Sequence, residues 1–373
     1  MSELYCPDCG SSYPLDTREP ACACGGLFEL RSDAPGYDPA LVDSGEWSMF
    51  RYRRFMPLAG EAWRRVSMGE GRTPVVRLDG RTLVKLDYLM PTLSFKDRGA
   101  AVLAARCAEL GVRRVVQDSS GNAGNAVAAY CARAGIACEI YVPEGSSPRK
   151  MAMIKAHGAS LVVVPGSRDD TARACREAVR RDGAYYASHV FNPLFYEGTK
   201  TYLYEVYEQL GRLPEALFIP VGNGTLFLGV SLALKELLAA GLINAFPRVV
   251  AVQSERCAPL AEAAAAGGES AGPALALPTL AEGIAIGEPA RARRILREAR
   301  ELGAEFALAP EADIMAARET LATKGFYVEH TTAAVYAAYL AWRGRSADEV
   351  DAAEAGGPEA LIPLCGAGLK SDK

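Results

Sequence analysis

Short apolar runs alternate along the chain with alanine-rich stretches of helical character. The apolar runs are Val112–Val116, Cys138–Val142, Leu161–Val164, Leu217–Val221 and Val249–Val252. Strands that alternate with helices in this way are typical of parallel sheets with helices on their faces. The sequence therefore predicts an α/β fold built on parallel sheets.

The composition is that of an ordinary globular chain. With 373 residues, 50% of them hydrophobic, and a formal net charge of −4, the chain is long enough for two domains and a small appendage. No charge cluster points to nucleic acid, and no apolar stretch is long enough to span a bilayer. The segment from Met1 to Cys6 lacks the basic and apolar regions of a secretory signal, so we expect a cytoplasmic protein without nucleic-acid or membrane partners.

A lysine with unusual neighbours lies in the hexapeptide Ser-Phe-Lys-Asp-Arg-Gly at Ser94–Gly99. A lysine attacks aldehydes only when part of its population is neutral, and an apolar neighbour or a nearby cation lowers its pKa for that purpose. Phe95 could be the apolar neighbour of Lys96, and Arg98 could be the nearby cation. A solvated charge run at a helix start has the same composition, so the interpretation depends on other motifs.

Two polar turns follow predicted strands and precede predicted helices. The first contains Ser119-Ser120-Gly121-Asn122, and free backbone N–H groups at such a helix start favour an anionic group. The second is Gly222-Asn223-Gly224-Thr225, whose glycines let the backbone approach a phosphate. Ordinary strand-to-helix loops use the same residues, so each turn by itself also fits a purely structural role.

Taken in chain order, these three motifs and the C-terminal run Leu364–Lys370 resemble the pyridoxal-phosphate enzymes of the tryptophan synthase β-subunit fold, or fold type II. Within that group the chain is most similar to the threonine synthase family, and the resemblance covers nearly the whole chain. It implies two open parallel-sheet domains with a small N-terminal zinc knuckle, and a homodimer. The implied boundaries are 1–35 for the knuckle, 36–80 plus 196–373 for the large cofactor-binding domain, and 81–195 for a small mobile domain.

The resemblance also implies roles for individual residues. Lys96 would bind pyridoxal phosphate covalently and later act as the proton-shuttling base. Other cofactor contacts would come from Phe95 and Asn122 at the ring, Cys365 at the pyridine nitrogen, and a phosphate cup of Gly222, Asn223, Gly224 and Thr225. The substrate carboxylate would be held by Ser119, Ser120, Gly121 and Ala123, and a substrate phosphate by Asn125, Ser167, Arg168 and Arg173.

The expected reaction is the conversion of O-phosphohomoserine to threonine and phosphate by elimination and addition of water, a step of amino-acid biosynthesis. Three departures from the family pattern keep other reactions open. The turn continues Ala123-Gly124-Asn125 without the usual hydroxyl residues, although Asn125 could take their place. Cys365 replaces a Ser or Thr and is a weaker hydrogen-bond donor, or simply a small buried residue. His330 stands where relatives tend to carry a proline.

Several alternatives therefore remain. Arg168 and Arg173 are either phosphate ligands or exposed helix residues. His330 and His189 are either additional acids or bases, or structural residues. The chain could instead be a β-replacement synthase acting on phosphoserine or another activated serine, as cysteate or cysteine synthases do, or a serine/threonine dehydratase. A noncatalytic relative would not need the aldehyde-binding lysine.

Four cysteines, Cys6, Cys9, Cys22 and Cys24, form two pairs near the N-terminus, each followed by glycine. Such paired turns can direct two sulfurs each at one tetrahedral ion, and zinc is the ion we expect. The second pair is Cys-x-Cys rather than Cys-x-x-Cys. A site of four sulfurs leaves no open position for chemistry, so the metal would be structural. Disulfides are the alternative, which a reducing compartment disfavours.

Overall fold

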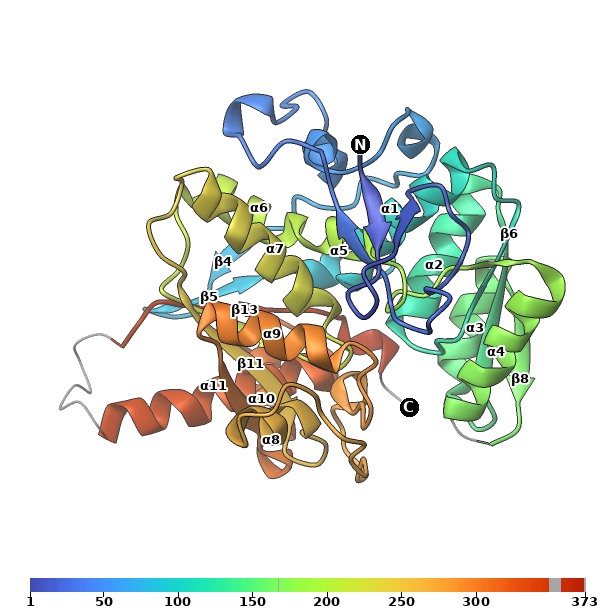
Figure 1. The fold of residues 1–373 in the computed structure, drawn as a ribbon. Coiled ribbons are helices and arrows are strands. Elements are labelled where there is room, and N and C mark those ends of the chain that lie inside the picture. Colours follow the sequence, from blue (N-terminus) through green and yellow to red (C-terminus); the bar gives the residue numbers. More distant parts are fainter. Residues whose placement is uncertain (167, 349–356, 372–373) are drawn as a thin grey trace. The chain divides into compact units, whose positions relative to one another are not determined.

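The computed structural model describes residues 1–166, 168–348 and 357–371 (Figure 1). The chain divides into two compact units. The first consists of Met1–Arg72 and Met90–Thr201, and the second of Thr73–Leu89 and the described residues from Tyr202 onward. In the described part of the chain, no helix is both long and apolar enough to cross a membrane.

The first unit contains a parallel sheet with the strand order β8-β7-β6-β9. Its strands are β6 (Arg114–Gln117), β7 (Ala137–Pro143), β8 (Ser160–Val164) and β9 (Tyr185–Tyr186). Each link between successive strands contains a crossover helix, as parallel pairing requires. The helices of this unit are α1 (Lys96–Glu109), α2 (Asn122–Ala134), α3 (Pro148–Ala156), α4 (Arg168–Asp182) and the short α5 (Leu194–Thr199).

The N-terminal knuckle, which also belongs to the first unit, is a small antiparallel sheet. Its strand order is β2-β1-β3, with β1 at Glu3–Tyr5, β2 at Ser12–Pro14 and β3 at Glu29–Arg31. Its buried cluster is small and consists of Leu4, Cys6, Cys22 and Phe28. A core of this size contributes little stability by itself, so a further support such as a metal would suit it.

The second unit is built on a sheet with the order β12-β11-β10-β13-β5-β4. Neighbouring strands are parallel except for β4, which pairs antiparallel with β5 at the edge. The strands are β4 (Val75–Arg77), β5 (Thr82–Lys85), β10 (Ala216–Pro220), β11 (Arg248–Ser254), β12 (Glu305–Ala309) and β13 (Ala360–Pro363). The helices are α6 (Thr201–Leu210), α7 (Thr225–Ala239), α8 (Pro259–Ala265), α9 (Ala292–Leu302), α10 (Ile314–Thr323) and α11 (His330–Asp348).

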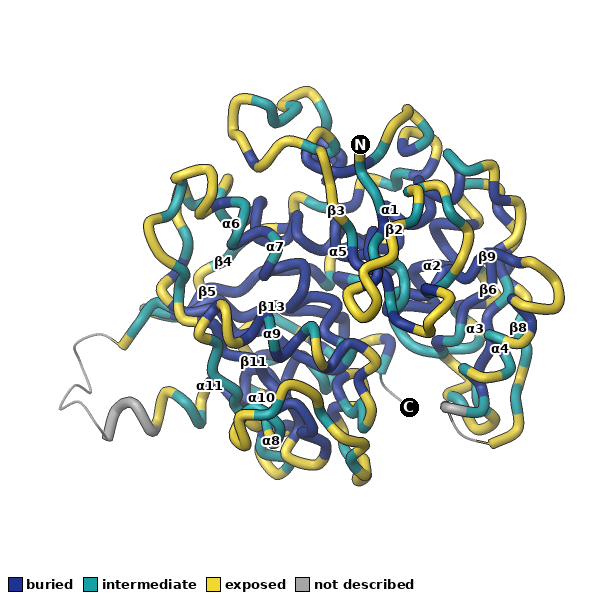
Figure 2. Tube along the Cα trace, in the orientation of Figure 1, coloured by how far each residue is buried: buried dark blue, intermediate teal, exposed yellow. Residues whose placement is uncertain are grey.

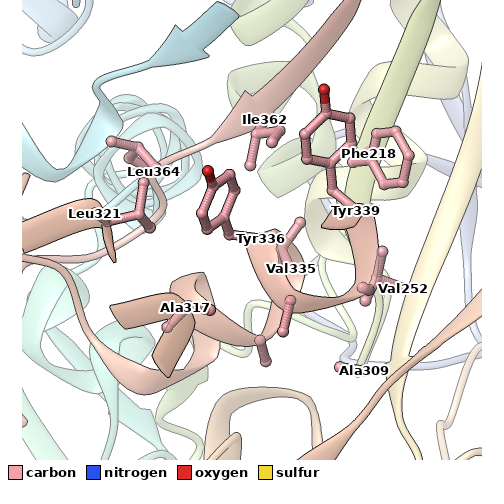
Figure 3. Packing of buried hydrophobic residues seen from close by; sticks show 14 of the residues in the cluster. Phe218, Val252, Ala309, Ala317, Leu321, Val335, Tyr336, Tyr339, Ile362 and Leu364 are labelled. Carbon is pink, nitrogen blue, oxygen red and sulfur yellow. The ribbon is translucent and has the colours of Figure 1, made fainter. Parts of the chain in front are cut away.

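The core of the second unit lies between its sheet and the helices α10 and α11 (Figure 3). The ring of Phe218 on β10 packs edge-on against Tyr339 of α11, with centroids 5.1 Å apart. The Tyr339 hydroxyl also shares a 2.7 Å hydrogen bond with Thr82 of β5, so the helix is tied to two strands. All residues of β5, β10 and β13 are buried (Figure 2), as expected for strands covered on both faces. β10 and β13 are accordingly apolar throughout, whereas β5 also carries Thr82 and Lys85.

The unit boundaries fall at other residues than the domain boundaries expected from the sequence. Residues 81–89, expected in the small domain, lie in the second unit because β5 pairs with β13 along its whole length. Residues 36–72, expected in the large domain, lie in the first unit. Strand pairing between segments almost three hundred residues apart leaves no local mark in the sequence, which is why the chain pattern did not reveal it.

Candidate active site

Lys96 is the first residue of α1, three residues earlier than the start expected from the small-residue stretch. The preceding turn contains Leu93 with a φ of 62°, a left-handed conformation that is uncommon for a leucine and recurs at functional sites. Asp97 holds this turn, since its carboxylate accepts hydrogen bonds from the backbone N–H of Thr92 at 2.7 Å and from the Thr92 hydroxyl. Lys96 is thus presented by a rigid turn rather than by a mobile loop.

The side-chain amine of Lys96 lies among aromatic rings. Its Nζ is 4.6 Å from the ring centroid of Phe95 and 5.8 Å from that of Phe195. The sequence predicts the Phe95 contact but not the Phe195 contact. Arg98, the cation expected to act on Lys96, is fully buried and donates from Nη1 to the hydroxyl of Thr201 at 2.9 Å.

The Ser-Ser-Gly-Asn turn joins β6 to α2, as predicted. Gly121 caps α2 without a side-chain hydrogen bond, so the first backbone N–H groups of this helix face the turn without a capping side chain. A Cβ atom at Gly124 would lie 1.8 Å from the carbonyl oxygen of Ser119. The absence of a hydroxyl side chain at this position therefore has a steric cause.

Buried polar atoms without a hydrogen-bond partner gather around this turn. They are the Ser94 Oγ, both amide atoms of Gln117, and the Asn125 Oδ1, and none of them has a partner among the described residues. A buried polar group left unsatisfied is costly, so these atoms indicate a place where a polar ligand completes the structure. Sequence reasoning missed Ser94 and Gln117; a glutamine at the carboxyl end of a buried strand was the available signal.

The glycine turn of the second unit joins β10 to α7. Gly224, with a φ of 72°, caps α7 and uses the left-handed conformation that glycine adopts without strain. The helix has no side-chain cap, and Thr225 at its first position is buried. Uncapped N–H groups at the start of a fifteen-residue helix are suited to a phosphate group.

Cys365 lies two residues after β13 and is 2% exposed. The next residue, Gly366, is fixed by its N–H, which donates to the Thr332 Oγ1 at 3.2 Å, and by its carbonyl, which accepts from the Glu329 N–H at 2.9 Å. The carboxyl group of Glu329 packs directly against Gly366. This brings a carboxylate close to Cys365, a neighbour that the sequence did not predict.

The two histidines singled out in the sequence have different surroundings. His330 begins α11, and its Nε2 lies 3.4 Å from the Arg318 Nη1. The ring of His189, in the first unit, packs edge-on against Phe195 with centroids 5.9 Å apart. His189 thus lies one ring away from Lys96, whereas His330 belongs to an arginine contact in the second unit.

The structure describes only part of the segment around the start of α4 that is expected to bind a substrate phosphate. Ser167 lies outside the described residues, and Arg168 begins α4 with a side chain that is also outside them. Arg173 is exposed and forms an ion pair with Asp170 one turn earlier on the same helix. Their role in binding a substrate phosphate stays a prediction.

The sulfurs of Cys6, Cys9, Cys22 and Cys24 converge, all lying within 4.8 Å of one another. All four are free thiols, so the disulfide alternative finds no support here. Hydrogen bonds with Ser11 lower the pKa of Cys9 to about 6. Thiolate sulfurs at this spacing are the donor set of a tetrahedral structural metal site.

A family model described as "Pyridoxal-phosphate dependent enzyme" matches residues 66–354 of the chain. The chain belongs to this family. The match includes Lys96, the Ser-Ser-Gly-Asn turn and the glycine turn, and it confirms the resemblance on which the predicted cofactor rests. The chain is thus a pyridoxal-phosphate dependent enzyme with an α/β fold of parallel-sheet units.

Several threonine synthases are similar to this chain over most of its length. The chain is 31% identical over 343 residues to that of Methanocaldococcus jannaschii, covering 88% of this chain and 84% of the relative. It is 30% identical over 351 residues to that of Methanosarcina acetivorans, covering 90% and 85%. Among solved structures, a threonine deaminase from T.th. aligns with a TM-score of 0.67 at 27% identity, covering 82% of this chain and 96% of that one.

A further solved structure with lower sequence identity supports the fold. The processed threonine deaminase of Solanum lycopersicum has a TM-score of 0.69 at 20% identity, covering 90% of this chain and 86% of that one. The residues of each unit fit one part of pyridoxal phosphate. The first unit offers a lysine for its aldehyde and buried polar atoms that have no partner among the described residues, and the second unit offers an uncapped helix start for its phosphate.

Proposed function

We propose that this enzyme is a threonine synthase that converts O-phosphohomoserine to threonine and inorganic phosphate. The observation that carries the proposal is the 31% identity to an archaeal threonine synthase over 88% of the chain. The Lys96 turn, the α2 turn and the glycine turn all lie within the matched family region, which supports chemistry that depends on pyridoxal phosphate.

When bound, pyridoxal phosphate supplies an electron sink that makes the bonds at the substrate α-carbon labile. Lys96 would hold the cofactor aldehyde and then carry protons between the carbon atoms of the substrate. Phe95 would pack against the cofactor ring and Asn122 would donate to its hydroxyl oxygen. Its phosphate would be bound by Gly222, Asn223, Gly224 and Thr225, and its pyridine nitrogen would face Cys365.

The substrate would bind by its two anionic ends. The backbone amides at the start of α2, with Ser119, Ser120, Gly121 and Ala123, would hold the carboxylate. Asn125, Ser167, Arg168 and Arg173 would bind the phosphate that leaves, since guanidinium groups match phosphate geometry. The unsatisfied Gln117 amide and Ser94 hydroxyl are further candidates for contact with the substrate or cofactor.

The test is to incubate the cofactor-loaded protein with O-phospho-L-homoserine and to assay threonine and inorganic phosphate in the same sample. The proposal predicts equal amounts of both products. Phosphate release without threonine would mean elimination without addition of water, and release of neither would refute the proposal.

A serine/threonine dehydratase is the second candidate. It is favoured by the similarity to a threonine deaminase at 27% identity and by Gly124, whose surroundings exclude the hydroxyl side chain that the phosphate-binding turn of threonine synthases is expected to carry. Ammonia release from free L-threonine or L-serine would identify this activity. Turnover of O-phospho-L-serine with a sulfur nucleophile would instead identify a β-replacement synthase.

We further propose that the four N-terminal cysteines bind one structural zinc ion, and that the enzyme is a cytoplasmic homodimer. The converging sulfurs support the metal. The proposed domains stay those that the family resemblance implies, although the compact units divide at other residues: the knuckle at 1–35, the large domain at 36–80 plus 196–373, and the small domain at 81–195. Metal analysis and the molar mass in solution test the first two statements.

A further inference from the structure

Phe195 forms a second aromatic wall beside Lys96, and the proposed function gives it no role. The ring is fully buried, and its centroid lies 5.8 Å from the Lys96 Nζ, within the range in which an aromatic face attracts a cation. Phe95 lies closer, at 4.6 Å. The amine thus has an aromatic face from its own turn and another from a segment one hundred residues later in the chain.

The position of Phe195 is fixed by the backbone of α5. The Phe195 N–H donates to the carbonyl of Asn192 at 3.2 Å, and the Asn192 Oδ1 accepts from the N–H of Leu194 at 3.0 Å. Edge-on packing of His189 holds the ring from a second direction. The backbone at position 195 and the His189 ring therefore both hold the Phe195 ring beside Lys96.

The contact between α1 and α5 depends on two glycines. A Cβ atom at Gly99 would lie 2.2 Å from the Phe195 ring, and one at Gly198 would lie 2.0 Å from the carbonyl oxygen of Arg98. The backbones of the two helices can approach this closely only because both positions lack a side chain. This approach places the Phe195 ring across the first turn of α1, beside the lysine.

We infer that Phe195 is a positioning residue that, together with Phe95, holds the Lys96 amine in the orientation needed to react with an aldehyde. This inference rests on the proposed role of Lys96. A long lysine side chain has many rotamers, and confining it between two rings removes the unproductive ones before reaction. Substrate contacts lie elsewhere, so the loss of Phe195 affects the rate of reaction of the lysine rather than substrate affinity.

The test uses pyridoxal without its phosphate as the probe, because its reaction reports on the lysine and not on the glycine turn. The full-length chain, freed of cofactor, is mixed with pyridoxal, and the rate of covalent attachment is followed by absorption. For Phe195→Leu we expect a rate at least about tenfold lower than that of the unchanged chain. Phe195→Tyr keeps the ring face and should react within about twofold of the unchanged chain.

The matched control is Phe50→Leu, which removes another fully buried ring from the same unit, one that packs against Trp63. It should lower the melting temperature while leaving the pyridoxal rate unchanged. For Phe195→Leu the kinetic result with substrate should be a lower kcat at nearly constant KM. A folded Phe195→Leu variant that reacts at the unchanged rate would overturn the inference. Attachment at the unchanged rate in Lys96→Ala would show that the probe reports on other amines, and would refute the role of Lys96 on which the inference rests.

Discussion

At the scale of single residues, the structure adds side chains to the turns that the sequence predicted as functional. Gly124 shows what the structure adds to the sequence. The sequence showed that a hydroxyl residue was missing, and the structure gives the reason, because the Ser119 carbonyl occupies the space where a Cβ would lie. Gln117 and Phe195 were missed because their significance depends on burial and on a neighbour distant in sequence.

Gly124→Ala should destabilise the first unit and disrupt the α2 turn. The added methyl group meets a backbone oxygen at 1.8 Å, so the turn must shift, at a cost of about 3 kcal/mol or more. Thermal unfolding measures the loss. Gly36→Ala, where no atom lies within 4 Å of the added Cβ, is the control and should change little. Equal melting temperatures for the two variants would show that the turn is not as tight as described.

Glu70 predicts a pH dependence of stability. Burial raises the pKa of Glu70 above its ordinary value of 4.5, while its carboxylate accepts hydrogen bonds from the Met68 N–H and the Tyr130 hydroxyl. The folded chain therefore keeps a proton that the unfolded chain has lost. Stability should fall as the pH rises from about 4.5 through the raised pKa, by at most about 1.4 kcal/mol per pH unit.

Glu70→Gln removes this titration. The difference in melting temperature between Glu70→Gln and the unchanged chain should therefore shift in favour of the variant as the pH rises through that window. Glu319→Gln, at an exposed position, is the control and should show no such trend. A constant difference for Glu70→Gln across the pH range would mean that folding does not raise the pKa of Glu70.

At the scale of elements, the strands that lead into the functional turns were predictable because buried parallel strands are continuous apolar runs. The structure places β6, β7, β8, β10 and β11 at the predicted runs within a few residues. The unit to which β5 belongs was not predictable, because its partner β13 lies far along the chain. A buried ion pair at the end of β5 also holds this strand in place.

Lys85 at the end of β5 forms a buried ion pair with Glu205 of α6, with Nζ and Oε2 2.7 Å apart. Lys85→Met should destabilise the second unit by about 3–5 kcal/mol, because Glu205 would stay buried without this cation. The double variant Lys85→Met with Glu205→Leu should recover much of this loss. Urea unfolding of the three variants measures the coupling, and additive losses would show that the two charges are independent.

The N-terminal knuckle has a small buried cluster, which the proposed zinc ion would support. Cys6→Ser should remove the zinc, reduce the metal content from one ion per chain to nearly none, and loosen the segment around the small cluster of Leu4 and Phe28. Cys257→Ser changes another buried cysteine outside the cluster and should keep the metal. Full metal content in Cys6→Ser would show that this sulfur is not a ligand.

At the scale of the whole molecule, the order of the motifs carried more information than any one of them. Each turn by itself fitted an ordinary strand-to-helix loop, but the lysine turn, the α2 turn and the glycine turn in this order predicted the cofactor, and the family match confirms it. The boundaries of the compact units and the walls around Lys96 were not predictable, since both arise from contacts between segments distant in sequence.

The account depends above all on Lys96 as the residue that binds pyridoxal phosphate. The most direct measurement is to treat the cofactor-loaded protein with sodium borohydride, which makes the bond between lysine and cofactor permanent, and to map the modified peptide by mass spectrometry. The account predicts a single phosphopyridoxyl group, carried by Lys96. Attachment at another lysine, or none in a protein that turns over its substrate, would contradict it.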